Sequence, residues 1–157
     1  MTDVRLATRS DAEGCVEVLA LLPDYFTPAT HEEVRERIGA GLSWVAVDGT
    51  SILGFILIEA RYRSTAEITF AAVSPQHRRS GVGSSLVAEA IEWLRASGVV
   101  AVEVKTLDSS MIYEPYVATR AFWESQGFVQ IDCIDPLPGW SEGNPSAVYV
   151  ACLAPTR

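Results

Sequence analysis

The stretch from Val73 to Ser85 constrains the fold more than any other part of this 157-residue chain. The residues before it form an apolar run typical of a strand, and those from Leu86 to Leu94 recur at helical spacing. Gly81 and Gly83 lie between these two patterns. We therefore expect a strand–turn–helix junction, with a helix that begins near Gly81 or Val82.

Such a junction is a candidate anion site. The first backbone N–H groups of a helix have no partner within the helix, and the helix dipole adds to their attraction for anions. Gly81 and Gly83 lack Cβ atoms, so a diphosphate could approach the backbone closely. Positive charge and hydroxyl donors come from Arg78, Arg79, Ser84 and Ser85. An ordinary helix start with flanking glycines is the alternative interpretation.

Familiar glycine-rich loops of other kinds fit less well. A Walker loop requires Gly-Lys-Ser or Gly-Lys-Thr, and the stretch from Val73 to Ser85 contains no lysine. A dinucleotide fingerprint requires a third glycine and a first strand directly before it. The loop therefore predicts a ligand that contains a diphosphate but is bound by neither of these two motifs.

Periodicity elsewhere predicts one mixed α/β domain over residues 1–157, in the order βααβββαβαββ. Strands are expected near residues 4–8, 42–47, 52–58, 66–73, 100–104, 128–134 and 147–153, and helices near 12–22, 30–38, 82–97 and 115–126. Asp48-Gly49 indicates a hairpin within an antiparallel meander of three strands. Capping boxes are expected to start the first two helices, at Ser10 with Glu13 and at Thr30 with Glu33. The apolar face of the first helix is expected to contain Ala12, Val16, Leu19 and Ala20.

The composition excludes several classes of function. A net charge of −8 argues against general nucleic-acid binding and mildly favours a cationic acceptor, although solubility alone also explains it. The three cysteines have no metal-ligand spacing, so we expect no metal site and free thiols, mostly in the core. No signal-peptide pattern or membrane-length apolar run is present, which predicts a cytoplasmic protein without a membrane partner.

Two motifs resemble those of one enzyme family. Val73-Ser74-Pro75 followed by Arg78-x-x-Gly81-x-Gly83 resembles the acyl-CoA-binding signature of the GNAT N-acyltransferases. Residues 121–128 resemble a second hallmark, in which Phe-Tyr-Glu precedes Gly-Phe, and the element order matches along nearly the whole chain. The resemblance implies a mixed, mostly antiparallel sheet with helices on both faces. It also implies direct transfer of an acetyl group from acetyl-CoA to a primary amine, without a metal.

The resemblance also implies where the cofactor would bind. Backbone N–H groups would hold the CoA pyrophosphate, from Arg79, Ser80, Gly81, Val82, Gly83 and Ser84, with Arg78 and Ser85 beside them. The main chain of Ala72 and Val73 would pair with the pantetheine arm like an added strand, and an N–H at about Val73 would polarise the thioester carbonyl. The acceptor would be a small-molecule amine or a peptide. Homodimers are common in the family, which makes a homodimer an expectation here.

Direct attack by an amine requires a group that accepts its proton. Glu67, in the strand that leads into the loop, is the expected base, directly or through a water. The resemblance implies this role, since some GNAT members carry a catalytic Glu six residues before the apolar position at the end of this strand, where Val73 stands here. Glu103 on the next strand is an alternative base. A solvent-facing strand carboxylate or a substrate anchor is the other interpretation of Glu67.

The general acid departs from the family pattern. The position of the usual tyrosine holds Trp123, whose indole N–H is not a useful acid near pH 7. Packing against the CoA arm or the substrate is expected instead, with an ordinary core aromatic as the alternative. Tyr116 is expected beside the CoA arm as a catalytic and cofactor-binding candidate, with Tyr113 and Tyr25 as weaker candidates. The acceptor site is expected to be bordered by residues 135–146, 23–30 and 62–63.

Two functions remain open from the sequence. The first is an acyltransferase, which Glu67 favours. The second is a CoA-binding regulatory or interaction module with weak or lost catalysis, which Trp123 favours.

Overall fold

A seven-stranded sheet runs through residues 1–154, the part of the chain that the computed structural model describes. Its strands are β1 (Asp3–Leu6), β2 (Leu42–Asp48), β3 (Ser51–Ala60), β4 (Thr65–Val73), β5 (Ala101–Leu107), β6 (Val129–Ile134) and β7 (Ser146–Cys152). The helices are α1 (Ala12–Ala20), α2 (Pro28–Arg37), α3 (Val82–Ala96) and α4 (Pro115–Ser125), with short 3-10 turns η1 (Arg9–Asp11) and η2 (Pro75–His77). The predicted order βααβββαβαββ is confirmed.

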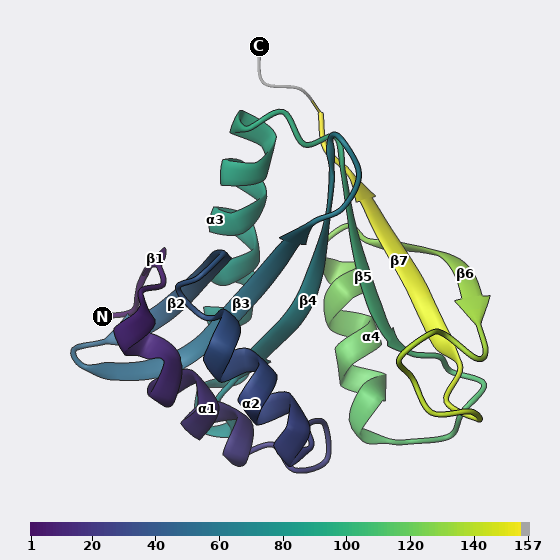
Figure 1. Ribbon diagram of the computed structural model, residues 1–157, viewed down its shortest axis with the longest axis horizontal. Coiled ribbons are helices and arrows are strands. Elements are labelled where there is room, and N and C mark those ends of the chain that lie inside the picture. The colour runs from purple at the N-terminus through teal and green to yellow at the C-terminus, as the bar shows by residue number, and fades with distance from the viewer. Residues whose placement is uncertain (155–157) are drawn as a thin grey trace.

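The strands lie in the order β1-β2-β3-β4-β5-β7-β6. β4 and β5 pair in parallel, and the other neighbouring pairs are antiparallel, as the mixed, mostly antiparallel sheet requires. Figure 1 shows α1 and α2 on one face of the sheet and α3 and α4 on the other. The hairpin at Asp48-Gly49 and the meander β2-β3-β4 are confirmed.

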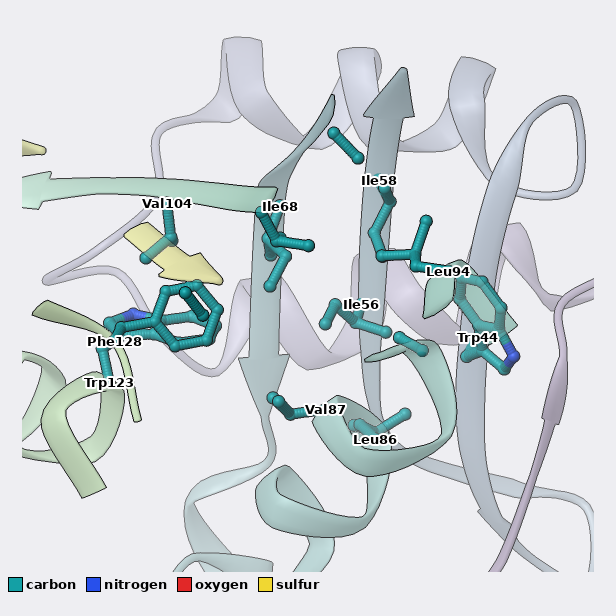
Figure 2. Packing of buried hydrophobic residues seen from close by; sticks show 14 of the residues in the cluster. Trp44, Ile56, Ile58, Ile68, Leu86, Val87, Leu94, Val104, Trp123 and Phe128 are labelled. Carbon is teal, nitrogen blue, oxygen red and sulfur yellow. The ribbon is translucent and has the colours of Figure 1, made fainter. Parts of the chain in front are cut away.

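Strand alternation divides the core between the two faces. On β3, Ile56 and Ile58 pack in a cluster beneath α3, whereas Phe55 and Leu57 pack in a second cluster beneath α1 and α2. Figure 2 shows the first cluster, in which side chains of α3 meet those of the central strands. Because both faces of the central strands are buried, their sequences read as continuous apolar runs.

The starts of α1 and α2 differ from the predicted capping boxes. Before α1, the Asp11 carboxylate accepts the N–H of Thr8 at 2.7 Å, so Thr8 and Asp11 form the reciprocal pair rather than Ser10 and Glu13. α2 begins at Pro28, whose fixed φ suits the first turn of a helix, with Thr27 before it. The predicted start at Thr30 was therefore wrong by one turn. Ala20 is exposed, and α1 buries Cys15 and Val18 instead.

Asp11→Asn is expected to lower the free energy of unfolding by about 2 kcal/mol near neutral pH. Hydrogen bonds from Arg5 lower the pKa of Asp11 from 3.8 to about 2. The contribution of the carboxylate is therefore complete above a pH of about 4 and is lost as the pH falls to about 2. Urea denaturation of both proteins across this range should show the difference shrinking, and the exposed Asp3→Asn variant should show little difference at any pH. A difference that stays constant down to pH 2 would contradict the assignment.

The three cysteines are free, but the expectation that most lie in the core was wrong. Cys15 is buried, whereas Cys133 and Cys152 are exposed near the end of the sheet formed by β6 and β7. Burial raises the pKa of the Cys15 thiol to about 12, so it stays protonated. Within residues 1–154, no helix is both long and apolar enough to cross a membrane, and no group of His, Cys, Asp and Glu could hold a metal ion.

Candidate functional site

The loop between β4 and α3 has the geometry expected of a helix-start anion site. After η2, Arg79 and Gly81 adopt positive φ angles of 59° and 86°, and α3 begins at Val82. The N–H of Ser85 donates to the carbonyl of Gly81 at 2.9 Å, which closes the first helical turn. The N–H groups before Ser85 therefore lack intrahelical acceptors and are available to an anion.

The two glycines of the loop have different reasons to be glycine. A Cβ added to Gly81 would meet no atom within 4 Å, so this side of the loop is open to a ligand. A Cβ added to Gly83 would lie 3.2 Å from the ring of Phe122. Gly83 therefore allows α4 to pack closely on α3, a role in addition to the predicted approach of the diphosphate.

The side chains of the loop also divide into two groups. The exposed ones can reach a ligand: Arg78, Arg79, Ser80, Ser84 and Ser85. The Val82 and Ala72 side chains are buried, so these residues can offer a ligand only their main chain. The donors present thus suit a diphosphate, because backbone N–H groups, hydroxyls and guanidinium groups surround an exposed glycine.

β4 and β5 separate at the point where the cofactor arm would enter. Their parallel pairing runs from Thr65–Ala101 to Ile68–Val104, after which both strands continue apart (Figure 1). Thr69 is an extra residue on β4, because Leu57 pairs with Phe70 while Ile58 pairs with Ile68. A bulge bends its strand and increases the local twist, which explains why the separation begins here. Beyond it, the edge of β4 can pair with an extended ligand.

Glu67 lies just before this bulge and is held by two cations. Arg61 donates to it through Nε at 2.6 Å and also through Nη2, and Lys105 lies 3.3 Å away. All three contacts fall on Oε2, which leaves Oε1 as the oxygen that can accept a proton. Only 6% of the residue is exposed. The carboxylate is therefore fixed by its partners rather than solvated, unlike the surface carboxylate of the alternative interpretation.

Glu67 and the alternative base Glu103 stand side by side on β4 and β5. Lys105 joins them, since its Nζ also lies 2.7 Å from Glu103. Burial alone would lower the pKa of Lys105, but the two carboxylates together raise it above its usual value. The hydrogen bond to Glu67 likewise raises the pKa of Arg61. Both cations therefore stay charged at neutral pH.

A pocket of about 300 Å³ opens over Glu67. Its lining is charged where it comes from α2, β3, β4 and β5, and apolar at the segment from Leu137 to Trp140. The expectation that residues 135–146 border the site is thus supported for this segment. A larger hollow of about 650 Å³ lies between α2 and β3. It includes no residue of β4, of β5 or of the loop between β4 and α3 (the cofactor loop), so it is not the candidate acceptor site.

Tyr116, Tyr25 and Tyr113 form an aromatic cluster at the start of α4. The rings of Tyr25 and Tyr116 lie 5.2 Å apart, and those of Tyr113 and Tyr116 lie 5.8 Å apart. The Tyr25 hydroxyl donates to the carbonyl of Pro115 at 2.7 Å, which ties the segment between α1 and α2 to the start of α4. Arg78 of the cofactor loop stacks on Tyr25, 5.1 Å from the ring centre. Tyr116 is thereby held close to that loop.

Burial raises the pKa of Tyr116, and the neighbouring tyrosines add to the shift. Its hydroxyl therefore stays protonated at neutral pH and can donate a hydrogen bond. The sequence had suggested these three tyrosines separately. Their meeting depends on segments about 90 residues apart, which no local pattern reveals.

The position of α4 depends on the connection after β5, which sequence reasoning missed. Asp108 accepts the N–H of Ser110 at 2.9 Å and a hydrogen bond from Gln130 at 2.7 Å, and these bonds lower its pKa to about 2. Arg120 of α4 donates to the carbonyl of Leu107 at 2.9 Å. An Asp followed two residues later by Ser directly after a strand is a turn signal that could have found this connection.

Trp123 lies in the core between two other aromatic side chains, as Figure 2 shows for its contact with Phe128. Its ring centre lies 5.0 Å from that of Phe122 and 5.2 Å from that of Phe128, in edge-to-face arrangements. Only 4% of the residue is exposed. The position supports the core-packing interpretation of this tryptophan, and its contact with the CoA arm stays a prediction.

Trp123→Tyr is therefore expected to lower the free energy of unfolding by about 2 kcal/mol without raising kcat. The smaller ring leaves space beside Phe128, and the new hydroxyl is buried without a hydrogen-bond partner. Thermal unfolding and initial rates of thiol release would measure the two effects. Trp93→Tyr on α3, where the residue is 40% exposed, serves as the control with little change. A rise in kcat for Trp123→Tyr would show instead that the chain lacks an acid at this position.

The sequence of this chain matches a model of a known protein family. A family model described as the acetyltransferase (GNAT) family matches residues 13–128. The chain belongs to this family. It is therefore an acetyltransferase whose acyl donor is acetyl-CoA, as the resemblance of its two motifs implied. Among curated proteins, none matches this GNAT chain.

Solved structures share the fold at low sequence identity. A protein from Desulfovibrio desulfuricans assigned to the GNAT family is 21% identical, with a TM-score of 0.86 over 98% of this chain and 100% of that one. The ribosomal-protein-S18-alanine N-acetyltransferase from Escherichia coli is 17% identical, with a TM-score of 0.78 over 100% and 97% of the two chains. An aminoglycoside 6'-N-acetyltransferase complexed with coenzyme A is 19% identical, with a TM-score of 0.76 over 99% of each chain. The acceptors in these names differ, so the shared fold does not specify an acceptor.

Proposed function

We propose that this GNAT protein transfers the acetyl group of acetyl-CoA directly to the primary amine of a small molecule. The observation that carries the proposal is the position of Glu67. Its clamped carboxylate faces a pocket at the strand separation, on the same strand that leads into the diphosphate loop. A base, an acceptor pocket and a cofactor path therefore meet on one strand.

The spacing along β4 supports a position for the reacting carbonyl. Glu67 and Val73 are six residues apart, which is about 20 Å at strand rise. A base must lie within hydrogen-bond reach of the attacking amine, directly or through one water. The carbonyl therefore lies near Thr69 to Ala71, where a backbone N–H freed by the strand separation would polarise it. Val73 and Ala72 would instead contact the pantetheine arm, which revises the predicted role of Val73.

The reaction needs no covalent intermediate on the enzyme. The amine nitrogen attacks the thioester carbonyl carbon, a C–N bond forms, and the C–S bond breaks. Glu67 takes the proton that the nitrogen loses, and CoA leaves as a thiolate that is then protonated. A CoA thiolate can leave without an enzyme acid, and the Tyr116 hydroxyl, which lies toward the loop rather than at the sulfur, would assist its protonation through a water.

The proposal is tested by release of CoA thiol from acetyl-CoA in the presence of a panel of small primary amines. Turnover of at least one amine, with the acetylated amine identified by mass, is the expected result. Tight acetyl-CoA binding without turnover of any amine would instead support a CoA-binding module. An absence of acetyl-CoA binding by calorimetry would overturn the cofactor assignment as well.

Tyr116→Phe is expected to lower kcat roughly tenfold, less than a typical general-acid effect because a thiolate leaves readily. Acetyl-CoA affinity should remain within a factor of about two, since the ring and its contact with Tyr25 are kept. Tyr113→Phe is the matched control, because its hydroxyl donates to the carbonyl of Asp24 at the edge of the same cluster. Equal rates for Tyr116→Phe and the unaltered protein would remove Tyr116 from the mechanism.

A further inference from the structure

The charges that line the acceptor pocket balance one another. Carboxylates come from Glu33, Glu59 and Glu67, and cations from Arg37, Arg61 and Lys105. The chain as a whole carries a net charge of −8, which favours polycations near its surface. At the pocket itself, however, the three cations cancel the three carboxylates, so the lining offers no net attraction to the additional positive charges of a polyamine. The local balance favours an acceptor that carries one positive and one negative group.

Arg37 is placed to bind the negative group. It lies at the end of α2 and donates to Glu33 at 3.1 Å, to Glu59 at 3.4 Å and to the hydroxyl of Thr69 at 3.2 Å. A guanidinium group has five N–H donors, so these three bonds leave two for a ligand. Thr69 is the bulge residue that follows Ile68, two positions from Glu67. A cation and the proposed base thus border the same part of the pocket.

The volume of the pocket and its apolar lining indicate what kind of side chain the acceptor carries. A volume of about 300 Å³ lies at the lower end of the roughly 300–1,000 Å³ usual for ligand pockets, which suits an acceptor of amino-acid size. The half-buried side chains of Leu137, Trp140 and Phe70 form an apolar surface in it. An apolar side chain of leucine or phenylalanine size would bury its surface there.

We propose that the acceptor is a free α-amino acid with an apolar side chain. Its amine meets Oε1 of Glu67, its carboxylate binds Arg37, and its side chain packs against Leu137 and Trp140. The inference rests on the acetyl transfer proposed above. The bond changes are the same, and the product is an N-acetyl amino acid with CoA thiol.

Matched acceptors test this inference. Phenylalanine is compared with 2-phenylethylamine, which lacks the carboxylate, with phenylalaninamide, which resembles a peptide N-terminus, and with spermidine. Rates of thiol release are expressed per concentration of unprotonated amine. We expect kcat/KM for phenylalanine to exceed that for 2-phenylethylamine at least tenfold. A kcat/KM for 2-phenylethylamine or spermidine that equals or exceeds that for phenylalanine would overturn the inference. An equal or higher kcat/KM for phenylalaninamide would also overturn it and would indicate a peptide N-terminus as the acceptor.

Direct binding separates this inference from the proposed function. Calorimetry with the CoA-saturated protein measures whether phenylalanine or leucine binds, independently of transfer. Binding of the amino acid without turnover would support the acceptor class and contradict the acetyl transfer. Turnover of other amines, without binding of either amino acid, would support the transfer and overturn the acceptor class. A lack of both binding and turnover would overturn both.

Arg37→Gln tests the placement of the carboxylate. It should raise KM for phenylalanine at least tenfold while changing KM for 2-phenylethylamine less than twofold. Arg35→Gln on the same helix is the control, because Arg35 pairs with Glu13 and Glu32 outside the pocket and should leave both values unchanged. An equal rise for both acceptors with Arg37→Gln would show a merely structural role and contradict the placement.

Discussion

Glu67→Gln is expected to lower kcat about 100-fold or more near neutral pH, the range typical of a lost general base. Glutamine keeps the shape of the side chain but cannot take the proton of the attacking amine. The loss should shrink as the pH rises, because a growing fraction of the amine is then already unprotonated in solution. Initial rates of thiol release across the pH range, with a saturating amine, measure this effect.

Two comparisons make the result specific to Glu67. Acetyl-CoA affinity should change less than about twofold, because the carboxylate lies beside the acceptor pocket and not in the diphosphate loop. Glu103→Gln removes the carboxylate paired with the same Lys105 and should lower kcat far less. A larger loss for Glu103→Gln would transfer the role of base to Glu103. An unchanged pH profile for Glu67→Gln would leave it only as a positioning residue.

Gly81→Asp is expected to weaken acetyl-CoA binding about 100-fold. The new side chain has space, since no atom lies within 4 Å of an added Cβ. Aspartate is also among the residues that best tolerate the positive φ of 86°. Its carboxylate would lie where the diphosphate binds, and repulsion between charges about 5 Å apart costs about 3 kcal/mol at an effective dielectric of about 20. Calorimetric titration with acetyl-CoA measures the change in affinity.

Matched variants separate charge from shape and from strain. Gly81→Asn has nearly the same shape without the charge and should lose less than about tenfold in affinity. Gly98→Asp lies at the other end of α3 with nearly the same φ of 87° and equally open space, so it should bind acetyl-CoA normally. Similar losses for Gly81→Asp and Gly81→Asn would indicate a steric effect. Full affinity in Gly81→Asp would show that the loop does not hold the diphosphate.

Much of the fold could be predicted because its signals are local. A hairpin turn at Asp48-Gly49, helical spacing from Leu86 to Leu94, and glycine after a helix at Gly127 each depend on neighbouring residues in the chain. The capping box predicted for the first helix failed because a residue of another element decides it. Ser10 with Glu13 has the right spacing, but the Asp11 carboxylate also binds Arg5 of β1, and this tertiary pair decides which residues precede the helix.

The sequence by itself determined the order of elements, through local periodicity along the chain, and the family, through motifs in contiguous residues from Val73 to Ser85 and from 121 to 128. Only the tertiary structure decided the acceptor end. The bulge at Thr69 and the ion pairs of Glu67 depend on partners from β3, β5 and the turn that contains Arg61. The tyrosine cluster joins the segment between α1 and α2 to the start of α4. Such contacts depend on the side-chain packing of distant segments, which no local periodicity specifies. The cofactor end is thus encoded locally, whereas the pocket for the acceptor is created by folding.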